Sequence, residues 1–579
     1  MNNILYQTYP ILKPVLLLLA AVITGTICIP YLKKIARKYK IYDHPDNDHS
    51  KRKVHSRPIP RIGGIAIFLS FIVTNLVFNR NSHFWILVLP SIPVFLLGLI
   101  DDVRSLSVKI RILIQLISAA LVVYLGRLAI DNLYFTPDLA IYLPYPTGFL
   151  LSVFIIVGAI NAINMVDGLD GLAGGLVLIA TVLMSYTLFI LNRDINFIYF
   201  FGIPVAGALL AFLKYNTYPA SLFMGDGGSY WLGFIISILM LYMLKHDPLL
   251  ISNNYNIPLI TPVLSLAIPI IDTFFVIIIR VVSGKSPATA DQSHFHHGLL
   301  KMGIPQSQVV LFIYFLSVVI AITGIMPIIF PAYISWIVSY ISPFLLLTIL
   351  YLVLKKEKNV SEKTALYELF IKNKNKRKEL NIFFLAWERF NRYTLYFILA
   401  GTPIIAGGSQ NSAIGYSAGI ILFLLIILIT FKMTRHDFFN VLIISVSSLL
   451  LLVANNVNSI SVELFNSQYY LQEYYNWLFI IFAISILFFI LLTFRRNYLM
   501  ISATDFIILT MPLLLFLLPN NIIQEWNLSI IGLRSMLLFI GFRVLAGNEN
   551  NFYLRIRYVV LISLLYLFLT DGLNFHILF

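Results

Sequence analysis

Cysteine and charge are the two features that this chain has least of. Its 579 residues include a single cysteine, Cys28, so neither a disulfide framework nor a cysteine metal site can form within one chain. Only 12% of the residues are charged, whereas soluble globular domains carry about 25%. The sequence also contains no P-loop, no dinucleotide-binding fingerprint and no serine nucleophile elbow. These absences argue against a soluble globular protein and against several common enzyme classes.

Long apolar runs are abundant instead. Hydrophobic residues make up 59% of the chain, and the mean hydropathy is +0.87. A membrane-spanning helix needs roughly 20 mostly apolar residues, which predicts an all-α polytopic membrane protein with an N-terminal bundle of about ten or eleven transmembrane helices and about seven further ones. The first block of predicted spans is Leu12–Leu32, Ile62–Phe78, Phe84–Ile100, Ile110–Leu125, Phe149–Ile163, Leu172–Leu191, Phe197–Leu213, Tyr230–Leu244, Val263–Val282, Val309–Ile329 and Ile334–Leu354.

The first of these spans is too long for a signal-peptide core, and no small-residue cleavage site follows it, so we expect a retained anchor. The chain then divides into three predicted parts: a membrane domain over 1–354, a basic cytoplasmic linker over 355–392, and a C-terminal transmembrane domain of unknown function over 393–579. The predicted spans of that last part are Tyr393–Ala406, Ala413–Phe431, Phe438–Val453, Trp477–Phe494, Phe506–Leu518, Ile530–Val544 and Val559–Leu573.

The net charge of +15 is concentrated in short loops between the apolar runs. This pattern is typical of cytoplasmic loops that face anionic lipid, so we expect a membrane-lipid partner and no nucleic acid. The loop after the first span holds ten basic residues and is assigned to the cytoplasm. Alternation then places four further loops on the cytoplasmic side, namely 101–109, 164–171, 214–228 and 283–308. These loops hold nearly every unusual polar residue of the N-terminal part.

Asp101 and Asp102 end the third predicted span. Adjacent carboxylates beside a bilayer are costly unless they are paired, hydrated or metal-bound. One interpretation is that they handle Mg²⁺ or a phosphate acceptor. The alternative is a helix-end pair that caps the next helix and pairs with Arg104 or Lys109.

A second cluster contains Asn161, Asn164, Asp167 and Asp170, and the first three recur at the spacing of one helix face. Carboxylate and amide oxygens suit Mg²⁺. Gly168 and Gly171 would let a bulky anion approach the backbone closely. The competing interpretation, helix packing through small residues, accounts for the glycines and leaves the Asp and Asn residues unexplained.

A third motif sets Asp226 among glycines at the start of a span. A carboxylate there suits metal-phosphate binding at a helix N-terminus, although a plain Asp/Gly turn capped by Ser229 would have the same sequence.

Histidines form the fourth cluster, at His294, His296 and His297. They could hold a pyrophosphate or protonate a leaving phosphate. Zinc binding and a solvated histidine patch are the alternatives, and Arg280 adds positive charge nearby. A fifth, basic motif precedes the second span and contains Lys53 and His55. Together these clusters offer cations, oxygen ligands and glycines at one membrane face, as phosphoryl transfer requires.

The segments KVHSRPIPRIGG, DDVRSLSVKIRILIQ, NAINMVDGLDGLAGG, MGDGGSYWLGF and PIIDTFFVIIIRVVSGKSPATADQSHFHH resemble the polyprenyl-phosphate N-acetylhexosamine-1-phosphate transferases (glycosyltransferase family 4). The branch they resemble most is the bacterial undecaprenyl-phosphate N-acetylglucosamine-1-phosphate transferases. The resemblance runs from about Tyr31 to Leu354. The chain departs from the family pattern at Gln292 and Gly298, where basic residues commonly flank the histidines.

The resemblance implies a Mg²⁺-dependent enzyme, with Mn²⁺ as a substitute ion, in the bacterial cytoplasmic (inner) membrane with its active site facing the cytoplasm. It implies a UDP-sugar donor, undecaprenyl phosphate as acceptor, a role in initiating cell-surface glycan synthesis, and a homodimer as a further expectation. By resemblance, the residues divide into metal ligands (Asn164, Asp226), groups that address the carrier phosphate (Asp101, Asp102), groups that shape the nucleotide-sugar site (Asp167, Asp170) and phosphate contacts (His294, His296, His297). Lys53, His55, Asn161 and Arg280 are further candidate substrate-binding residues.

A protein of another class remains the alternative, either a non-enzymatic polyprenyl-lipid translocator or a scaffold of a glycan assembly complex. A translocator would need cationic residues along a path through the membrane. The predicted spans of the N-terminal part place their polar residues at one surface instead, which favours the enzyme.

Overall fold

The computed structural model describes residues 2–39, 41–43, 58–79, 82–136, 139–191, 197–245, 257–282, 294–301, 306–329 and 336–341, together with two short strands and single residues elsewhere. The chain forms two compact units. One comprises Lys13–Asn359 and Ser502–Ile507, and the other comprises Met1–Leu12, Val360–Ile501 and Ile508–Phe579. The second unit contributes the antiparallel pair β5 (Ser461–Leu464) and β6 (Ser467–Tyr470). The spans predicted after residue 392 lie outside the described residues.

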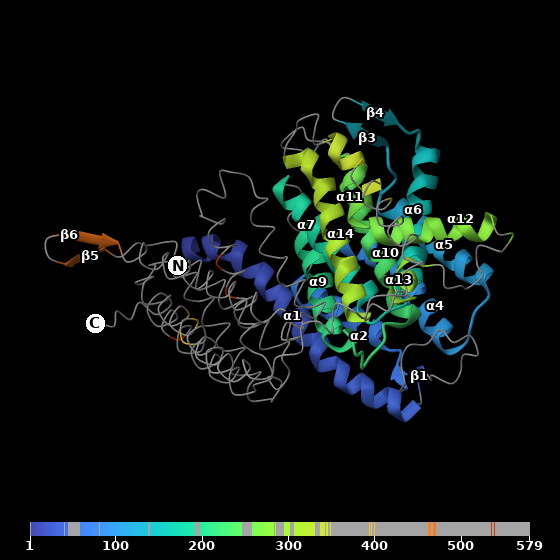
Figure 1. Cartoon of the computed structure of the whole chain (residues 1–579), viewed down its shortest axis with the longest axis horizontal. Helices are drawn as coiled ribbons and strands as arrows, with labels where there is room; N and C mark the ends of the chain where they lie inside the picture. The colour runs from blue at the N-terminus through green and yellow to red at the C-terminus, as the bar shows by residue number, and fades with distance from the viewer. Residues whose placement is uncertain are drawn as a thin grey trace, which may run out of the picture. The chain divides into compact units, whose positions relative to one another are not determined.

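Helices make up most of the first unit (Figure 1). They are α1 (Asn2–Tyr39, which begins in the other unit), α2 (Gly63–Phe78), α3 (Ser82–Val88), α4 (Ser91–Val103), α5 (Val108–Leu125), α6 (Tyr145–Val166), α7 (Leu172–Ile190), the π-helical turn η2 (Ile198–Gly202), α9 (Ile203–Asn216), α10 (Gly225–Leu244), α11 (Ile260–Ser265), α12 (Ala267–Val282), α13 (Phe295–Lys301) and α14 (Gln306–Ile329).

Within the described residues, eight helical stretches are long and apolar enough to cross a membrane. This confirms a polytopic membrane protein of mainly helical structure. Two predicted boundaries were wrong in ways that matter for the site. Helix α10 begins at Gly225 rather than Tyr230, so Asp226 lies in its first turn. Helix α6 continues to Val166, so Asn161 and Asn164 are helical while Asp167 follows the last helical residue.

Two of the predicted spans are broken helices. Helices α3 and α4 are separated at Pro90, and proline interrupts the helical hydrogen-bond ladder. Helices α11 and α12 are separated at Leu266. In Figure 1, α12 extends roughly horizontally whereas α7 and α14 extend roughly vertically. The break therefore turns the chain before it reaches the histidine cluster.

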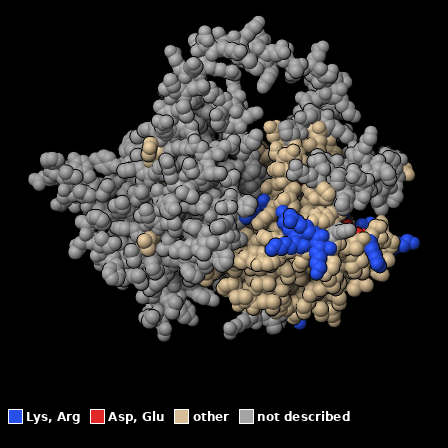
Figure 2. Space-filling view, turned by 90° about the horizontal axis from the view of Figure 1, so that it is seen from below, with Lys and Arg blue, Asp and Glu red and all other residues tan. Residues whose placement is uncertain are grey.

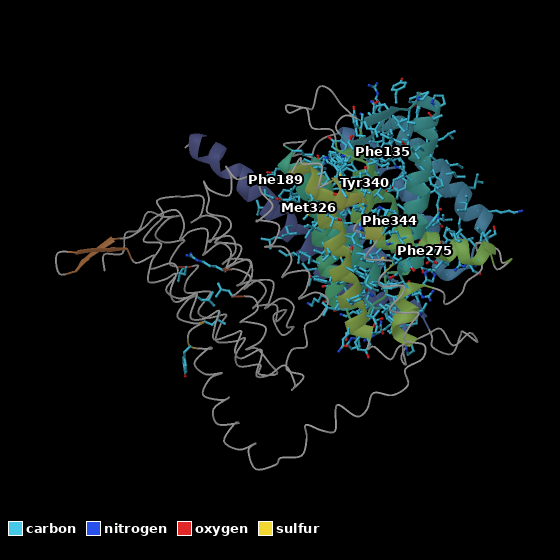
Figure 3. The ribbon with its side chains drawn as sticks, turned by 45° about the horizontal axis from the view of Figure 1, so that its top comes forward. Phe135, Phe189, Phe275, Met326, Tyr340 and Phe344 are labelled. Atoms are coloured by element: carbon cyan, nitrogen blue, oxygen red, sulfur yellow. The ribbon has the colours of Figure 1, made fainter. Side chains whose placement is uncertain are left out.

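Two short antiparallel hairpins complete the first unit, and the sequence had predicted only loops there. Strands β1 (Tyr42–Asp43) and β2 (Ile59–Pro60) pair within the first basic loop. Strands β3 (Asn132–Thr136) and β4 (Leu139–Tyr142) pair between α5 and α6. The hairpin of β3 and β4 lies at the top of Figure 1, and β1 lies toward the opposite end. The Tyr340 hydroxyl donates to the Phe135 carbonyl (2.7 Å), and Figure 3 labels both residues.

Helix α10 is the core of this unit. Almost every residue along it is buried, and it packs mainly against α4, α6 and α2. The Trp231 indole N–H donates to the Ser91 hydroxyl on α4 (3.0 Å). Glycines bring the backbones together at the start of α10: a Cβ on Gly64 would lie 2.3 Å from the Gly228 nitrogen, and one on Gly98 would lie 2.5 Å from the Asp226 carbonyl oxygen. The first turn of α10 is thus held between α2 and α4.

We predict that Gly98→Ala destabilises the protein by about 1–3 kcal/mol, because the added methyl group meets backbone atoms that cannot rotate away. The matched control is Gly158→Ala in α6, where a Cβ would have no neighbour within 4 Å. That control should leave stability unchanged or slightly raised, since alanine favours helix over glycine by about 1 kcal/mol. Thermal unfolding in detergent measures both. Equal unfolding temperatures for the two variants would contradict the close packing.

Candidate active site

The two acidic neighbours at the end of α4 have different partners, and Asp102 caps α10. Its Oδ1 accepts from the Asp226 N–H (2.9 Å), and its Oδ2 accepts from the Gly227 N–H (3.2 Å). The first N–H groups of a helix have no intrahelical acceptor, so a carboxylate there satisfies their hydrogen bonds. The positive end of the helix dipole also stabilises its negative charge. The capping alternative is therefore observed, but for α10 rather than for the next helix. The N-terminus proposed as an anion site holds a carboxylate of the chain itself.

Gly225 makes this cap possible. Its φ is +74°, a conformation that costs other residues energy. A Cβ at this position would also lie 2.6 Å from Asp102 Oδ2. Both observations explain why glycine precedes Asp226.

Asp101 faces three donors. Its Oδ1 accepts from the Leu106 N–H (2.7 Å), and its Oδ2 accepts from the Tyr230 hydroxyl (2.9 Å) and from Arg111 (3.1 Å). The Asp101 side chain is only 5% exposed. Arg111 also donates to the Tyr230 hydroxyl (3.2 Å). The carboxylate is thus held rigidly between α4, α5 and α10. Its ion-pair partner is Arg111, rather than Arg104 or Lys109 as the capping alternative expected.

Asn164 and Asp226, the two predicted metal ligands, lie together. The Asn164 amide donates through Nδ2 to Asp226 Oδ1 (2.8 Å) and to the Ser229 hydroxyl (3.0 Å). These two donations turn Asn164 Oδ1 away from both partners. The hydrogen bond from Asn164 to Asp226 therefore joins α6 to the first turn of α10.

Asp167 brings a further carboxylate to the same place. Burial, followed by the negative charges of Asp226 and Asp102, raises the pKa of Asp167 to about 7, while Arg61 acts in the opposite direction. Carboxylates that raise one another's pKa in this way are stabilised by a cation between them. The charge balance of this cluster therefore suits a divalent cation.

The loop between α6 and α7 is fastened to the loop before α10. Asp170 Oδ2 accepts from the Ala220 N–H (2.8 Å). Gly171, at φ +84°, donates its N–H to Asn216 Oδ1 (3.0 Å), and its carbonyl accepts from the Tyr314 hydroxyl of α14. Asp170 thus holds the backbone at Ala220, in the loop before α10, against the α6–α7 loop.

The histidine cluster lies against the same α6–α7 loop. A Cβ on Gly168 would lie 2.7 Å from His296 Nε2, so the absence of a side chain here leaves room for the imidazole. The His296 ring is 5.4 Å from that of His294 and 4.5 Å from that of His297, measured between centroids. Burial lowers the pKa of His296 to about 3, which keeps its ring neutral at physiological pH. Among the described residues, the buried His296 Nε2 has no hydrogen-bond partner.

Comparison with known proteins shows the family of this chain. The model of the family described as glycosyl transferase family 4 matches residues 84–244. The probable undecaprenyl-phosphate N-acetylglucosaminyl 1-phosphate transferase of Bacillus subtilis (strain 168) is 33% identical over 320 residues, covering 54% of this chain and 85% of the relative. This chain belongs to glycosyl transferase family 4.

Two further members of the family extend the comparison. The undecaprenyl-phosphate alpha-N-acetylglucosaminyl 1-phosphate transferase of Salmonella typhi is 27% identical over 317 residues, or 52% of this chain and 80% of the relative. The protein of the same name from Thermotoga maritima is 27% identical over 269 residues, or 46% of this chain and 75% of the relative.

The remaining candidate substrate-binding residues were predicted from the sequence to lie near the site. Asn161 donates to Gln115 Oε1 (2.8 Å) and to the Val157 carbonyl (2.8 Å), so its amide nitrogen is engaged between α5 and α6. Arg280 is buried near the end of α12, at 5% exposure. Lys53 and His55 lie outside the described residues.

The acidic cluster offers oxygen donors of the kind that Mg²⁺ takes in proteins. No three His, Cys, Asp or Glu side chains converge as a complete metal site within the described part of the chain. Mg²⁺ in proteins usually takes one or two carboxylates and completes its shell with water and substrate phosphates. The Asp226 carboxylate within a surrounding acidic cluster fits that requirement. Asn164 would add its amide oxygen after the amide turns over, because it now faces Asp226 through Nδ2.

Sequence reasoning missed several residues that position the site. Most of them are polar residues within an apolar span, and such residues are functional candidates by default. That signal could have found Asp272, Arg111, Tyr230 and Tyr314, whereas Asn216 lies beyond the predicted span Phe197–Leu213.

We predict that Asp102→Ala lowers stability by about 0.5–2 kcal/mol, the usual effect of removing a helix cap. Asp102→Asn should have a smaller effect, because its amide oxygen still accepts one N–H. Ser107→Ala is the control, since this exposed cap of α5 accepts a single long bond of 3.4 Å. Thermal unfolding in detergent ranks the three variants. An Asp102→Ala protein as stable as the wild type would refute the cap.

Proposed function

We propose that this chain transfers N-acetylglucosamine-1-phosphate from a UDP-sugar to undecaprenyl phosphate. One observation carries the proposal. Asp226 and Asn164 meet at the start of α10, and the histidine cluster lies against the α6–α7 loop that follows Asn164. The relatives from Bacillus subtilis and Salmonella typhi are named as undecaprenyl-phosphate N-acetylglucosaminyl 1-phosphate transferases. The chemistry of the site and the family agree on the reaction class.

The reaction is a single displacement. An oxygen of the carrier phosphate forms a bond to the sugar-bearing phosphorus, the bond from that phosphorus to UMP breaks, and UMP leaves with the electron pair. One phosphoanhydride replaces another, so the protein mainly positions the reactants and neutralises charge. A polyprenyl-diphospho-sugar remains, which would initiate cell-surface glycan synthesis.

Asp226 and Asn164 are the proposed ligands of Mg²⁺, which would neutralise charge on the pyrophosphate of the donor. Asp102 keeps this pair in place by holding the first turn of α10. Asp167 adds negative charge beside them. Its raised pKa, about 7 without a cation, is expected to fall when a cation binds, because a nearby positive charge favours the carboxylate.

Asp101 is proposed to orient the carrier phosphate rather than to act as a base. A phosphate monoester has a second pKa near ~6, so the nucleophile is already mostly a dianion at neutral pH. Asp101 also accepts from Leu106, Tyr230 and Arg111, and these donors hold it in place. Arg111, 31% exposed, adds a cation beside this carboxylate that can attract the phosphate.

Apolar side chains on α12 offer a surface for the carrier's hydrocarbon chain. Phe274, Phe275 and Ile278 are exposed, at 61%, 55% and 39%, and Figure 3 labels Phe275. Arg280 and Asp272 on the same helix are buried. We propose that the lipid tail packs along the exposed residues of α12, with the phosphate directed to the site.

We propose that the site faces the cytoplasm of a bacterial inner membrane. The view from below shows Lys and Arg gathered on one face of the described unit, with Asp and Glu beside them (Figure 2). The last turn of α1 ends with Arg37 and Lys38. The positive-inside rule assigns such a basic end to the cytoplasm. We further propose that residues 1–354 carry the transfer.

We predict that the purified full-length protein converts undecaprenyl phosphate and radiolabelled UDP-N-acetylglucosamine into a lipid-linked product and UMP. A metal chelator should abolish this activity, and added Mg²⁺ should restore it. Failure of the wild-type protein to act on any UDP-N-acetylhexosamine would overturn the proposed function.

In the same assay, Asp226→Ala and the isosteric Asp226→Asn should each lower the rate by about 100-fold or more. The several kcal/mol that a metal ion supplies correspond to tenfold for each ~1.4 kcal/mol. Thermal unfolding shows whether each variant is folded. Near-normal activity in a folded Asp226→Ala protein would disprove the metal assignment.

For Asp101→Asn we predict a loss of transfer that stays constant as pH rises above the second pKa of the carrier phosphate, near ~6. An orienting carboxylate is not replaced by a more basic solution, whereas the loss of a general base is offset as pH rises. A pH–rate profile of the variant against the wild type decides. Recovery of Asp101→Asn at high pH would identify Asp101 as a base.

A further inference from the structure

Asp272 is a buried carboxylate on α12 that no motif above had assigned. It is 8% exposed, and both of its oxygens are engaged by the start of the histidine segment. Oδ2 lies 2.9 Å from His294 Nδ1, and Oδ1 accepts from the Phe295 N–H (2.8 Å). One carboxylate therefore fixes both the His294 ring and the backbone that follows it.

This contact determines which atom His294 can present. A carboxylate accepts hydrogen bonds and cannot donate them, so His294 Nδ1 carries the hydrogen that faces Asp272. The other ring nitrogen, Nε2, then lies on the opposite edge of the imidazole. His294 is itself 8% exposed, so its ring has little freedom to turn.

The ring is also fixed relative to the rest of the site. His294 stacks with His296 at 5.4 Å and an interplanar angle of 19°. His296 in turn lies against Gly168, four residues after Asn164. A displacement of His294 would therefore disturb the ring that contacts the α6–α7 loop.

We propose that Asp272 is a positioning residue for the transfer reaction: it holds His294 in one tautomer and one orientation, with Nε2 available to the phosphates of the donor. The proposal rests on the proposed function, and it extends that function to a residue outside the acidic cluster. A plain structural link between α12 and α13 is the competing explanation, and the two differ in what a double-mutant cycle shows.

The test compares Asp272→Asn, His294→Gln and the double variant in the full-length protein, measuring kcat for lipid-linked product. Asparagine can still accept from the Phe295 N–H, but it no longer presents a carboxylate to Nδ1. We expect kcat to fall by about 10–100-fold, the range for losing a group that orients a functional histidine in metal sites. The double variant should be no slower than His294→Gln, because Asp272 acts through His294.

Thr273→Val is the matched control on the same helix, since the buried Thr273 hydroxyl is among the described groups that lack a hydrogen-bond partner. Its kcat and unfolding temperature should match those of the wild type. If Asp272→Asn does not fold, Asp272→Ser, which also lacks the carboxylate, takes its place in the cycle with the same criterion.

Two results would overturn the proposal: a folded Asp272 variant with wild-type kcat, or losses in kcat that multiply in the double variant as independent effects do. Failure of the proposed function gives a different result, because the wild-type protein itself would then form no lipid-linked product.

Discussion

The carboxylate of Asp102 at the N-terminus of α10 is the interaction on which the rest of the site depends. It joins the end of α4 to the first turn of the most buried helix in the unit. Asp226, the Asn164 contact and the glycine packing of α2 and α4 all lie within that turn. A helix start that is capped by a residue of another helix has a defined position and direction. The side chains in that turn, Asp226 among them, are therefore held in place as well.

Two groups of titratable side chains lie near this point. Carboxylates from α4, α10 and the residue after α6 form an acidic cluster, and burial together with their mutual repulsion raises the pKa of Asp167. The histidine cluster adjoins it, because His296 lies against Gly168, the residue after Asp167, and burial keeps His296 neutral. The acidic cluster can accept the negative phosphates of the proposed nucleotide-sugar only together with a cation. The histidines can contact phosphate oxygens directly through hydrogen bonds.

The sequence was sufficient to predict the class of fold, because the length of an apolar run is a local signal. The pairing of Asn164 with Asp226 came from the family resemblance, and the two residues do lie in contact although 62 positions separate them. Their role as metal ligands stays a prediction. The partners of Asp101 could not be predicted, since Arg111 and Tyr230 approach it through tertiary packing. The contact of Gly168 with the His296 ring was not predicted for the same reason. The short hairpins were missed because two to five residues per strand leave almost no periodic pattern.

The glycines at the start of α10 also limit how this site can diverge. Gly64, Gly98 and Gly225 each face backbone or carboxylate atoms closer than a methyl group allows. A side chain at any of these three positions would require backbone or the Asp102 carboxylate to move. Gly298, beside the histidines, differs, because among the described residues no atom lies within 4 Å of the place of a Cβ. A substitution meant to alter the contacts of the site can therefore be accommodated on α13 but not at the start of α10.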